Sequence, residues 1–284
     1  MKHNHPKIEI MDTTLRDGEQ TSGVSFVPHE KLMIARLLLE ELKVDRVEVA
    51  SARVSEGEFD AVRMICDWAA RRNMLPKVEV LGFVDGCTSV DWIHATGCRV
   101  INLLCKGSLK HCNCQLKKTP EEHIKDILAV VDYANEQDME VNIYLEDWSN
   151  GMKDSPEYVF LLMDALDQTN IKRYMLPDTL GILNPLQVIG FMRKMVKRYP
   201  QAHFDFHAHN DYDLAVSNVL AAVLSGCKGL HTTINGLGER AGNAPLASVQ
   251  AILKDHFNAI TNIDENRLND VSRVVESYSG IVIP

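Results

Sequence analysis

Residues 7–20 read Lys7-Ile8-Glu9-Ile10-Met11-Asp12-Thr13-Thr14-Leu15-Arg16-Asp17-Gly18-Glu19-Gln20. This segment is the most informative one for the fold. Residues 7–11 form an apolar run that is typical of a buried β-strand, and this run is followed at once by an arginine, carboxylates and a glycine. Charged side chains directly after a buried strand are typical of a ligand-binding loop in an α/β protein. The pattern therefore predicts a first strand that leads into a functional loop.

Strand-like and helix-like segments alternate from this point to the end of the sequence. Strands are predicted over residues 7–12, 44–50, 77–83, 100–105, 140–145, 173–176, 202–207 and 229–234. Helical spacing of apolar residues is found over residues 31–42, 59–70, 121–135, 156–166, 186–198, 214–224 and 265–278. Eight strands alternating with helices predict an α/β fold, a TIM (β/α)8 barrel. A doubly wound open sheet is the alternative, although no glycine-rich dinucleotide loop follows the first strand.

The composition limits the partners of the chain. Its 284 residues suffice for one large barrel, and 45% hydrophobic with 24% charged residues is an ordinary composition. A net charge of −9 argues against nucleic acid or an anionic membrane as a partner. No apolar stretch reaches the about 20 residues of a membrane-spanning helix, and the N-terminus has no apolar signal core. Seven scattered cysteines suggest no disulfide framework, so a cytoplasmic location is expected.

Two histidines late in the sequence complement the first loop. Phe204-Asp205-Phe206 leads into His207-Ala208-His209-Asn210-Asp211. In a βα barrel the strand ends share one mouth, and residues i and i+2 of a strand share a face. Asp17, His207 and His209 are therefore predicted to bind one divalent metal ion and to leave positions open for a substrate. The alternative is that the histidines only pack or form hydrogen bonds.

Further polar residues are predicted at the same mouth. Glu48 lies inside an apolar strand, and because a buried carboxylate needs a partner, we expect it to pair with Arg16. Glu146 ends the fifth strand, and Thr179 follows the sixth within Pro177-Asp178-Thr179-Leu180-Gly181. Both are expected to face a substrate. A plain capped turn is an equally good interpretation of the segment around Thr179.

The last polar block follows the eighth predicted strand, in Asn235-Gly236-Leu237-Gly238-Glu239-Arg240-Ala241-Gly242-Asn243. Its glycines allow the backbone to approach a ligand closely, and exposed amides before a helix favour an anion. A structural turn is the alternative. Asn243 is a candidate for a further oxygen ligand of the metal.

These blocks together resemble the DRE-TIM metallolyase superfamily, in particular its acetyl-CoA Claisen-condensing branch of 2-isopropylmalate, homocitrate and citramalate synthases. The blocks are residues 12–20, His207-x-His209-Asn210-Asp211 and Gly236-x-Gly238-Glu239-Arg240-x-Gly242-Asn243, and the resemblance covers nearly the whole chain. It implies a TIM barrel that binds Mg²⁺ or Mn²⁺, with Zn²⁺ as the alternative, and that uses acetyl-CoA as co-substrate. The metal ligands that it implies are Asp17, His207, His209 and, more weakly or through water, Asn243.

The resemblance also implies roles for the remaining polar residues. Arg16 contacts the keto oxygen of a small-molecule 2-oxo acid, and Glu48 holds Arg16. Glu146 and Thr179 match positions that bind the 2-oxo acid. Arg16, Glu48 and Glu146 are the expected catalytic residues.

Within the branch, three segments are most similar to the bacterial citramalate synthases, namely residues 21–26, 50–57 and 144–151. This similarity implies a tight apolar pocket of Leu81, Leu104 and Tyr144, which accepts the methyl group of pyruvate and crowds the isopropyl group of 2-oxoisovalerate. The expected function is an acyltransferase that makes (R)-citramalate in the isoleucine and leucine branch of amino-acid biosynthesis. Because a methylene group changes binding by only about 1–3 kcal/mol, a 2-isopropylmalate synthase is the alternative. A lyase or aldolase of the superfamily and a metal-bound 2-oxo acid sensor are further alternatives.

The family also sets expectations for the ends of the chain. We expect a catalytic barrel over residues 1–260, and a C-terminal helix with the start of a linker over residues 261–284. Relatives form dimers and continue into a linker, whose His and Tyr residues are implicated in acid–base chemistry, and into a regulatory domain. The chain is expected to be a homodimer that is either truncated or a barrel-only relative. In both cases substrate binding is expected to survive better than catalysis.

Overall fold

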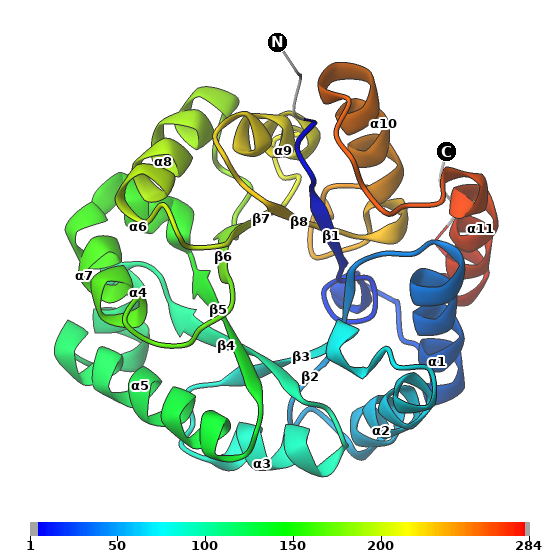
Figure 1. Cartoon of the computed structure of the whole chain (residues 1–284), viewed down its shortest axis with the longest axis horizontal. Helices are drawn as coiled ribbons and strands as arrows, with labels where there is room; N and C mark the ends of the chain where they lie inside the picture. Colours follow the sequence, from blue (N-terminus) through cyan, green and yellow to red (C-terminus); the bar gives the residue numbers. More distant parts are fainter. Residues whose placement is uncertain (1–4, 282–284) are drawn as a thin grey trace.

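Eight parallel strands close into a barrel at the centre of the molecule (Figure 1). The computed structural model describes residues 5–281, and the strands in this range are β1 (Glu9–Asp12), β2 (Arg46–Ser51), β3 (Val78–Phe83), β4 (Val100–Lys106), β5 (Glu140–Glu146), β6 (Tyr174–Asp178), β7 (Phe204–Ala208) and β8 (Gly229–Thr232). β1 pairs with β8 in the register Glu9↔Gly229 to Asp12↔Thr232, which closes the sheet. The predicted TIM barrel is confirmed, and the doubly wound alternative is wrong because the strand order never reverses.

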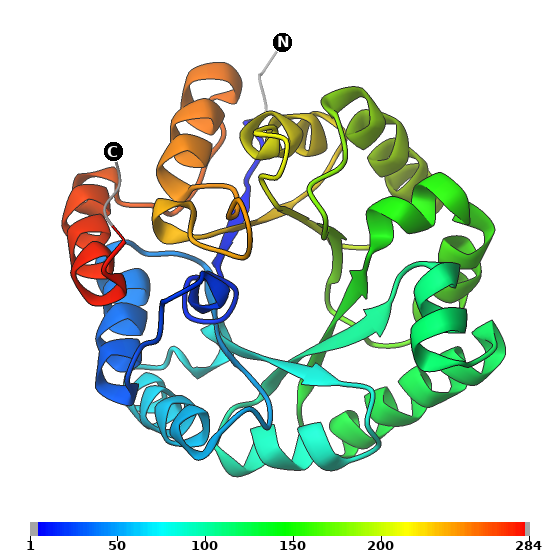
Figure 2. The ribbon, with the colours of Figure 1, turned by 180° about the vertical axis from the view of Figure 1, so that it is seen from behind.

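Helices surround this barrel, as the view from the opposite side also shows (Figure 2). In the described part of the chain they are α1 (Pro28–Arg36), α2 (Glu56–Arg71), α3 (Thr88–Ala95), α4 (Leu109–His111), α5 (Pro120–Glu136), α6 (Trp148–Asp154), α7 (Pro156–Leu166), α8 (Pro185–Arg198), α9 (Ala215–Leu224), α10 (Leu246–Phe257) and α11 (Leu268–Ser279). Capping boxes, Thr119 with Glu122 and Asn184 with Gln187, fix the starts of α5 and α8. None of the helices between residues 5 and 281 has the length and apolar character needed to cross a membrane.

The predicted segments differ from the observed helices in a few places. The first helix begins at Pro28 and ends at Arg36, and a π-helical turn over Leu37–Glu41 follows it. α3 was not predicted because its eight residues are fewer than the window that reveals helical periodicity. α10 was also missed, although its buried Leu246, Val249 and Leu253 have helical spacing. In the expected C-terminal segment α11 packs beside α1, and residues 1–4 and 282–284 lie outside the described residues.

The inside of the barrel has an apolar layer next to the mouth. It consists of Met11, Leu81, Tyr144 and Met175, and Leu104 packs against it. The larger hydrophobic core lies between the strands and the surrounding helices. Because the strand ends are held by packing on both sides, the loops that follow them have a rigid base.

Candidate active site

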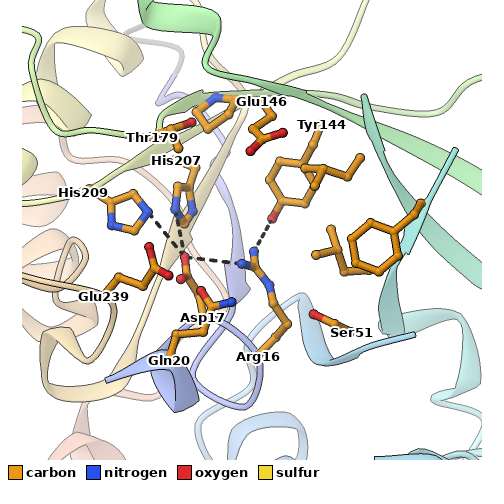
Figure 3. A pocket seen from close by; sticks show the side chains of 14 residues that line it. Arg16, Asp17, Gln20, Ser51, Tyr144, Glu146, Thr179, His207, His209 and Glu239 are labelled. Carbon is orange, nitrogen blue, oxygen red and sulfur yellow. Dashed lines mark hydrogen bonds and ion pairs between the residues drawn. The ribbon is translucent and has the colours of Figure 1, made fainter. Parts of the chain in front are cut away.

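Three potential metal ligands converge at the mouth of the barrel. Asp17 follows β1, His207 lies in β7, and His209 comes directly after β7. The Asp17 Oδ2 atom lies 3.0 Å from His207 Nε2 and 3.7 Å from His209 Nε2 (Figure 3). One ligand atom from each residue lies within 4.8 Å of the others. A carboxylate with two imidazoles is a donor set that suits Mn²⁺ and Zn²⁺ and leaves coordination positions for a substrate.

A tight backbone turn after β1 brings Asp17 to the mouth of the barrel. The carbonyl oxygen of Thr13 accepts hydrogen bonds from the backbone nitrogens of Arg16, Asp17 and Gly18 at 3.1, 2.8 and 3.1 Å. Thr14 Oγ1 accepts a hydrogen bond from the Ile234 backbone nitrogen at 2.8 Å, which ties this loop to the one after β8. A tight turn at the end of β1 therefore places Asp17 opposite β7.

The surroundings of these residues fit a bound cation. Asp17 Oδ2, His207 Nδ1 and His209 Nδ1 are buried and form no hydrogen bond with any described residue. Burial tends to raise the pKa of Asp17, but the charge of Arg16 and the two histidines lower it well below its ordinary value. Burial lowers the pKa of His209 to about 4, so its ring is neutral and a nitrogen lone pair is available.

Asn243 lies next to this cluster. It forms a β-bridge with His209, and its Nδ2 donates to the carbonyl oxygen of Leu237 at 3.0 Å. Its Oδ1 has no hydrogen-bond partner among the described residues. Gly238 makes room for this side chain, because a Cβ atom at Gly238 would lie 2.3 Å from Asn243 Nδ2. The metal roles of Asn243 and of the three converging residues stay predictions.

Arg16 lies beside the cluster and is held by two side chains from the barrel. Its Nε donates to Glu48 Oε2 at 2.5 Å, and its Nη2 donates to the Tyr144 hydroxyl at 3.3 Å. Its Nη1 lies 3.6 Å from Asp17 Oδ2. Glu48 is fully buried, and its Oε1 accepts from Asn102 Nδ2 at 2.7 Å. The expected contact between Arg16 and Glu48 is present, and the catalytic roles of both residues stay predictions.

A pocket of about 240 Å³ opens above Arg16 and the histidines. Leu81, Phe83, Leu104 and Tyr144 give the pocket an apolar wall, and we call Asp17, His207 and His209, which also line it, the metal cluster. All residues that were predicted to bind substrate line it, namely Arg16, Leu81, Leu104, Tyr144, Glu146 and Thr179. The sequence prediction missed Gln20, Ser51, Phe83, Pro177 and Glu239, which also line it. Of these, only Phe83 lies outside the sequence blocks that were singled out, namely residues 12–20, 50–57, 177–181 and 235–243.

Two polar residues at the rim of the pocket have defined partners. Glu146 forms an ion pair with Lys106, which ends β4. Thr179 Oγ1 accepts a hydrogen bond from the Asp147 backbone nitrogen at 3.0 Å. The hydroxyl hydrogen of Thr179 is therefore available for an oxygen atom in the pocket.

A second group of charged residues lies deeper in the barrel and was not predicted. Arg46 donates to both carboxylate oxygens of Glu79 at 3.1 and 3.3 Å and also forms an ion pair with Asp205. His231 Nε2 lies 3.2 Å from Asp205 Oδ2, and its Nδ1 lies 3.1 Å from the Tyr144 hydroxyl. Burial lowers the pKa of His231 to about 4, although Asp205 acts in the opposite direction. We call Arg46, Glu79, Asp205 and His231 the deep cluster.

The fold and the site define a TIM barrel with a candidate metal centre beside an arginine at its mouth. The chain belongs to the HMGL-like family, whose family model matches residues 7–275. This confirms the resemblance to the DRE-TIM superfamily, which was based on the three polar blocks.

The chain is similar to synthases of several kinds. It is 36% identical over 280 residues to 2-isopropylmalate synthase of Saccharolobus solfataricus, an alignment that covers 98% of this chain and 70% of that protein. It is 34% identical over 279 residues to (R)-citramalate synthase of Methanocaldococcus jannaschii, covering 98% of this chain and 54% of that protein. The chain thus spans about half the length of its citramalate synthase relatives. The hydroxymethylglutaryl-CoA lyase of Bacillus subtilis has the same fold, with a TM-score of 0.83, 21% identity and coverage of 99% of this chain and 96% of that one.

Proposed function

We propose that the chain is the catalytic barrel of an acyltransferase that condenses acetyl-CoA with a 2-oxo acid, and that the acid is pyruvate. Water then hydrolyses the thioester of the condensation product, so the products are (R)-citramalate and CoA. One observation supports this most directly: a single small pocket is lined by Arg16, by the metal cluster and by the apolar wall. A 2-oxo acid has the matching division into a keto acid group and an aliphatic group.

The polar side of the pocket suits the keto acid group. A divalent ion bound by Asp17, His207 and His209 supplies Lewis-acid polarisation of a carbonyl group. Arg16 stabilises negative charge that develops on the keto oxygen, and Glu48 fixes the direction of its guanidinium group. The hydroxyl of Thr179 donates to the substrate carboxylate. Glu146 lies at the rim, where it positions substrate or water with Lys106 as its counter-ion.

The apolar side of the pocket suits a small aliphatic group. Leu81 and Leu104 lie on neighbouring strands in the register Leu81↔Asn102 and Phe83↔Leu104, and the Tyr144 ring completes the wall. These side chains leave room for a methyl group and crowd an isopropyl group. Two additional methyl groups change binding by a few kcal/mol, because each methylene is worth about 1–3 kcal/mol.

Calorimetric titration of the Mn²⁺-loaded chain tests this proposal. Pyruvate is expected to bind at least tenfold more tightly than 2-oxoisovalerate, which corresponds to about 1.4 kcal/mol. An Arg16→Lys variant, which keeps the charge but loses the planar fork, serves as the site control and is expected to bind pyruvate weakly. Binding of neither acid by the wild-type chain would overturn the proposal.

A second candidate is 2-isopropylmalate synthesis, because a relative with that name is 36% identical to this chain. Tighter binding of 2-oxoisovalerate than of pyruvate would favour it and contradict the pocket argument. Leu81→Ala shortens a side chain of the apolar wall, which enlarges the pocket and leaves the metal cluster unchanged. If pyruvate is the substrate, this variant should shift the preference toward 2-oxoisovalerate.

The proposal also covers the cellular location and the oligomeric state of the protein. We propose a cytoplasmic homodimer whose catalytic barrel comprises residues 1–260, with a role in isoleucine or leucine biosynthesis. The molar mass in solution tests the assembly, since one chain has a mass of 31.9 kDa. A single species at that mass would contradict the dimer.

A further inference from the structure

A row of buried polar side chains extends from the pocket into the barrel, where bulky apolar residues are usual. Tyr144, His231, Asp205 and Arg46 form this row, and none is more than 5% exposed. Its members are joined by Tyr144–His231 and His231–Asp205 contacts of 3.1 and 3.2 Å and by the Asp205–Arg46 ion pair. Buried polar groups are costly unless they are paired, so a connected row of this kind specifies one side-chain arrangement.

The chemistry of the row sets the direction of its hydrogen bonds. The Asp205 carboxylate can only accept, so His231 Nε2 carries the hydrogen and the Nδ1 of the neutral ring accepts. The Tyr144 hydroxyl therefore donates to His231. Its other acceptor, Glu48 Oε2, is more distant at 3.4 Å and already accepts from Arg16 Nε at 2.5 Å. The lone pairs of the Tyr144 oxygen then face Arg16 Nη2, which lies 3.3 Å away.

Gly229 supports this arrangement independently. Its backbone needs no unusual conformation, but a Cβ atom there would lie 2.0 Å from Asp205 Oδ1. The glycine thus leaves the space that the carboxylate occupies. His203 Nε2 lies 3.0 Å from the same oxygen, whereas His231 contacts the other oxygen, Oδ2. The position of Asp205 below His231 is thereby fixed from several directions.

The geometry points to His231 as a positioning residue for the proposed reaction: held by Asp205, it makes Tyr144 a hydrogen-bond acceptor that fixes the rotation of the Arg16 guanidinium group. This inference rests on the proposed function for its purpose. Glu48 holds Nε and Tyr144 holds Nη2, and two anchor points define the plane of the group. The remaining N–H groups of Arg16 are available to the keto oxygen, whereas Tyr144 has no hydrogen to donate to a substrate.

Nitrogen-15 NMR of the arginine side chains tests the inference without turnover, and an Arg16→Lys variant assigns the signals. Replacing His231 by Leu removes the nearer acceptor of the Tyr144 hydroxyl and leaves only the more distant Glu48 Oε2, so rotation of the Arg16 Nη2 group should become about fivefold to tenfold faster, as for the loss of one hydrogen bond. The Nε signal, held by Glu48, should change little. His231→Asn, which places an acceptor oxygen near the position of Nδ1, should restore slow rotation.

Two further variants separate positioning from general loosening. Tyr144→Phe should reproduce the effect of His231→Leu, and the double variant should add nothing because both changes break the same connection. Val219→Ala, a change in buried α9 away from the pocket, should lower stability but leave Arg16 unaffected. Unchanged rotation in His231→Leu, or additive effects in the double variant, would overturn the inference.

Pyruvate binding connects the NMR result with the proposed function. His231→Leu should weaken pyruvate binding roughly tenfold, because Arg16 loses its fixed direction, and His231→Asn should restore most of the affinity. If the wild-type chain binds no 2-oxo acid, the proposed function is contradicted, while the rotation of Arg16 still decides whether His231 positions it.

Discussion

The mouth of the barrel and the deep cluster contain the same kinds of residues in different arrangements. In the deep cluster the guanidinium group of Arg46 is the cation, and it contacts both Glu79 and Asp205. At the mouth Arg16 stands to one side, and the Asp17 carboxylate faces two histidine nitrogens beside a pocket. Buried carboxylates therefore indicate a ligand site where no cationic side chain of the protein already neutralises them.

The largest effect is expected from removing the cation of the deep cluster. Arg46→Met leaves Glu79 and Asp205 buried without the guanidinium group that neutralises them and should lower the free energy of unfolding by about 3–5 kcal/mol. Arg173 forms a more exposed pair with Glu9, so Arg173→Met should cost only about 0–1 kcal/mol. Urea unfolding followed by circular dichroism measures both. Equal costs for the two variants would contradict a special role of the deep cluster.

A metal ion should stabilise the mouth and leave the deep cluster unaffected. At a Mn²⁺ concentration of one hundred times its dissociation constant, the gain is about 2.7 kcal/mol, and a chelator should abolish it. His209→Gln should lose the gain. Asp205→Asn should keep it on a lower baseline, since the deep cluster provides no ligand. Thermal unfolding with and without Mn²⁺ measures these increments, and a full gain in His209→Gln would show that the ion binds elsewhere.

Acidification should act on both regions, through one histidine in each. Burial lowers the folded-state pKa of His209 and of His231 from 6.5 to about 4. Between these pH values the unfolded chain binds more protons, so each histidine destabilises the fold as the pH falls from 6.5 toward 4. The share of each is on the order of 2–3 kcal/mol.

Urea unfolding across this pH range, in chelator, measures the slope of stability against pH. His209→Asn and His231→Asn should each remove the contribution of one histidine from this slope. The variants are compared with the wild type because burial raises the pKa of Asp12 to about 7, and this carboxyl group stabilises the fold as the pH falls. Added Mn²⁺ should protect the His209 share as long as the ion stays bound. An unchanged slope in both variants would mean that other groups set the acid limit.

The smallest effect is expected at the rim of the mouth. Arg240 forms two hydrogen bonds with Asp211, at 2.7 and 3.0 Å, and one with the carbonyl oxygen of Thr179 at 2.9 Å. Arg240→Ala should cost no more than about 1 kcal/mol of stability because the pair is exposed. Pyruvate affinity should nevertheless fall a few-fold, since Thr179 loses a support. Arg198→Ala removes a similar exposed contact to Asp164 and should leave affinity unchanged.

Local sequence pattern was sufficient for the barrel and for much of the mouth. Each strand was visible as a short apolar run, and in a βα barrel every strand end lies at one mouth, so Asp17 and His207 could be placed together without knowing the register. Glu48 was informative because a carboxylate in an apolar strand requires a partner, and Arg16 is that partner.

The deep cluster could not be predicted from the sequence of any single strand. His231 and Tyr144 meet across the inside of the barrel, from strands that are not neighbours, so their contact depends on tilt and register. The argument that was applied to Glu48 also applies to Asp205, which lies between two phenylalanines, and to His231 in β8. Their polar character was visible, but not the partners that satisfy it.

The closure of β1 against β8 has a consequence for how the chain folds. Asp17 belongs to the first strand–loop unit, whereas His207 and His209 belong to the seventh, so the three candidate ligands meet only when distant parts of the sequence have come together. A chain that has left the ribosome only as far as β6 has one of the three candidate ligands and no β8 to pair with β1. Such distant contacts form slowly. If these residues bind the ion, uptake of metal during synthesis requires the first and the seventh strand–loop units to have met, and metal in the medium should slow their separation.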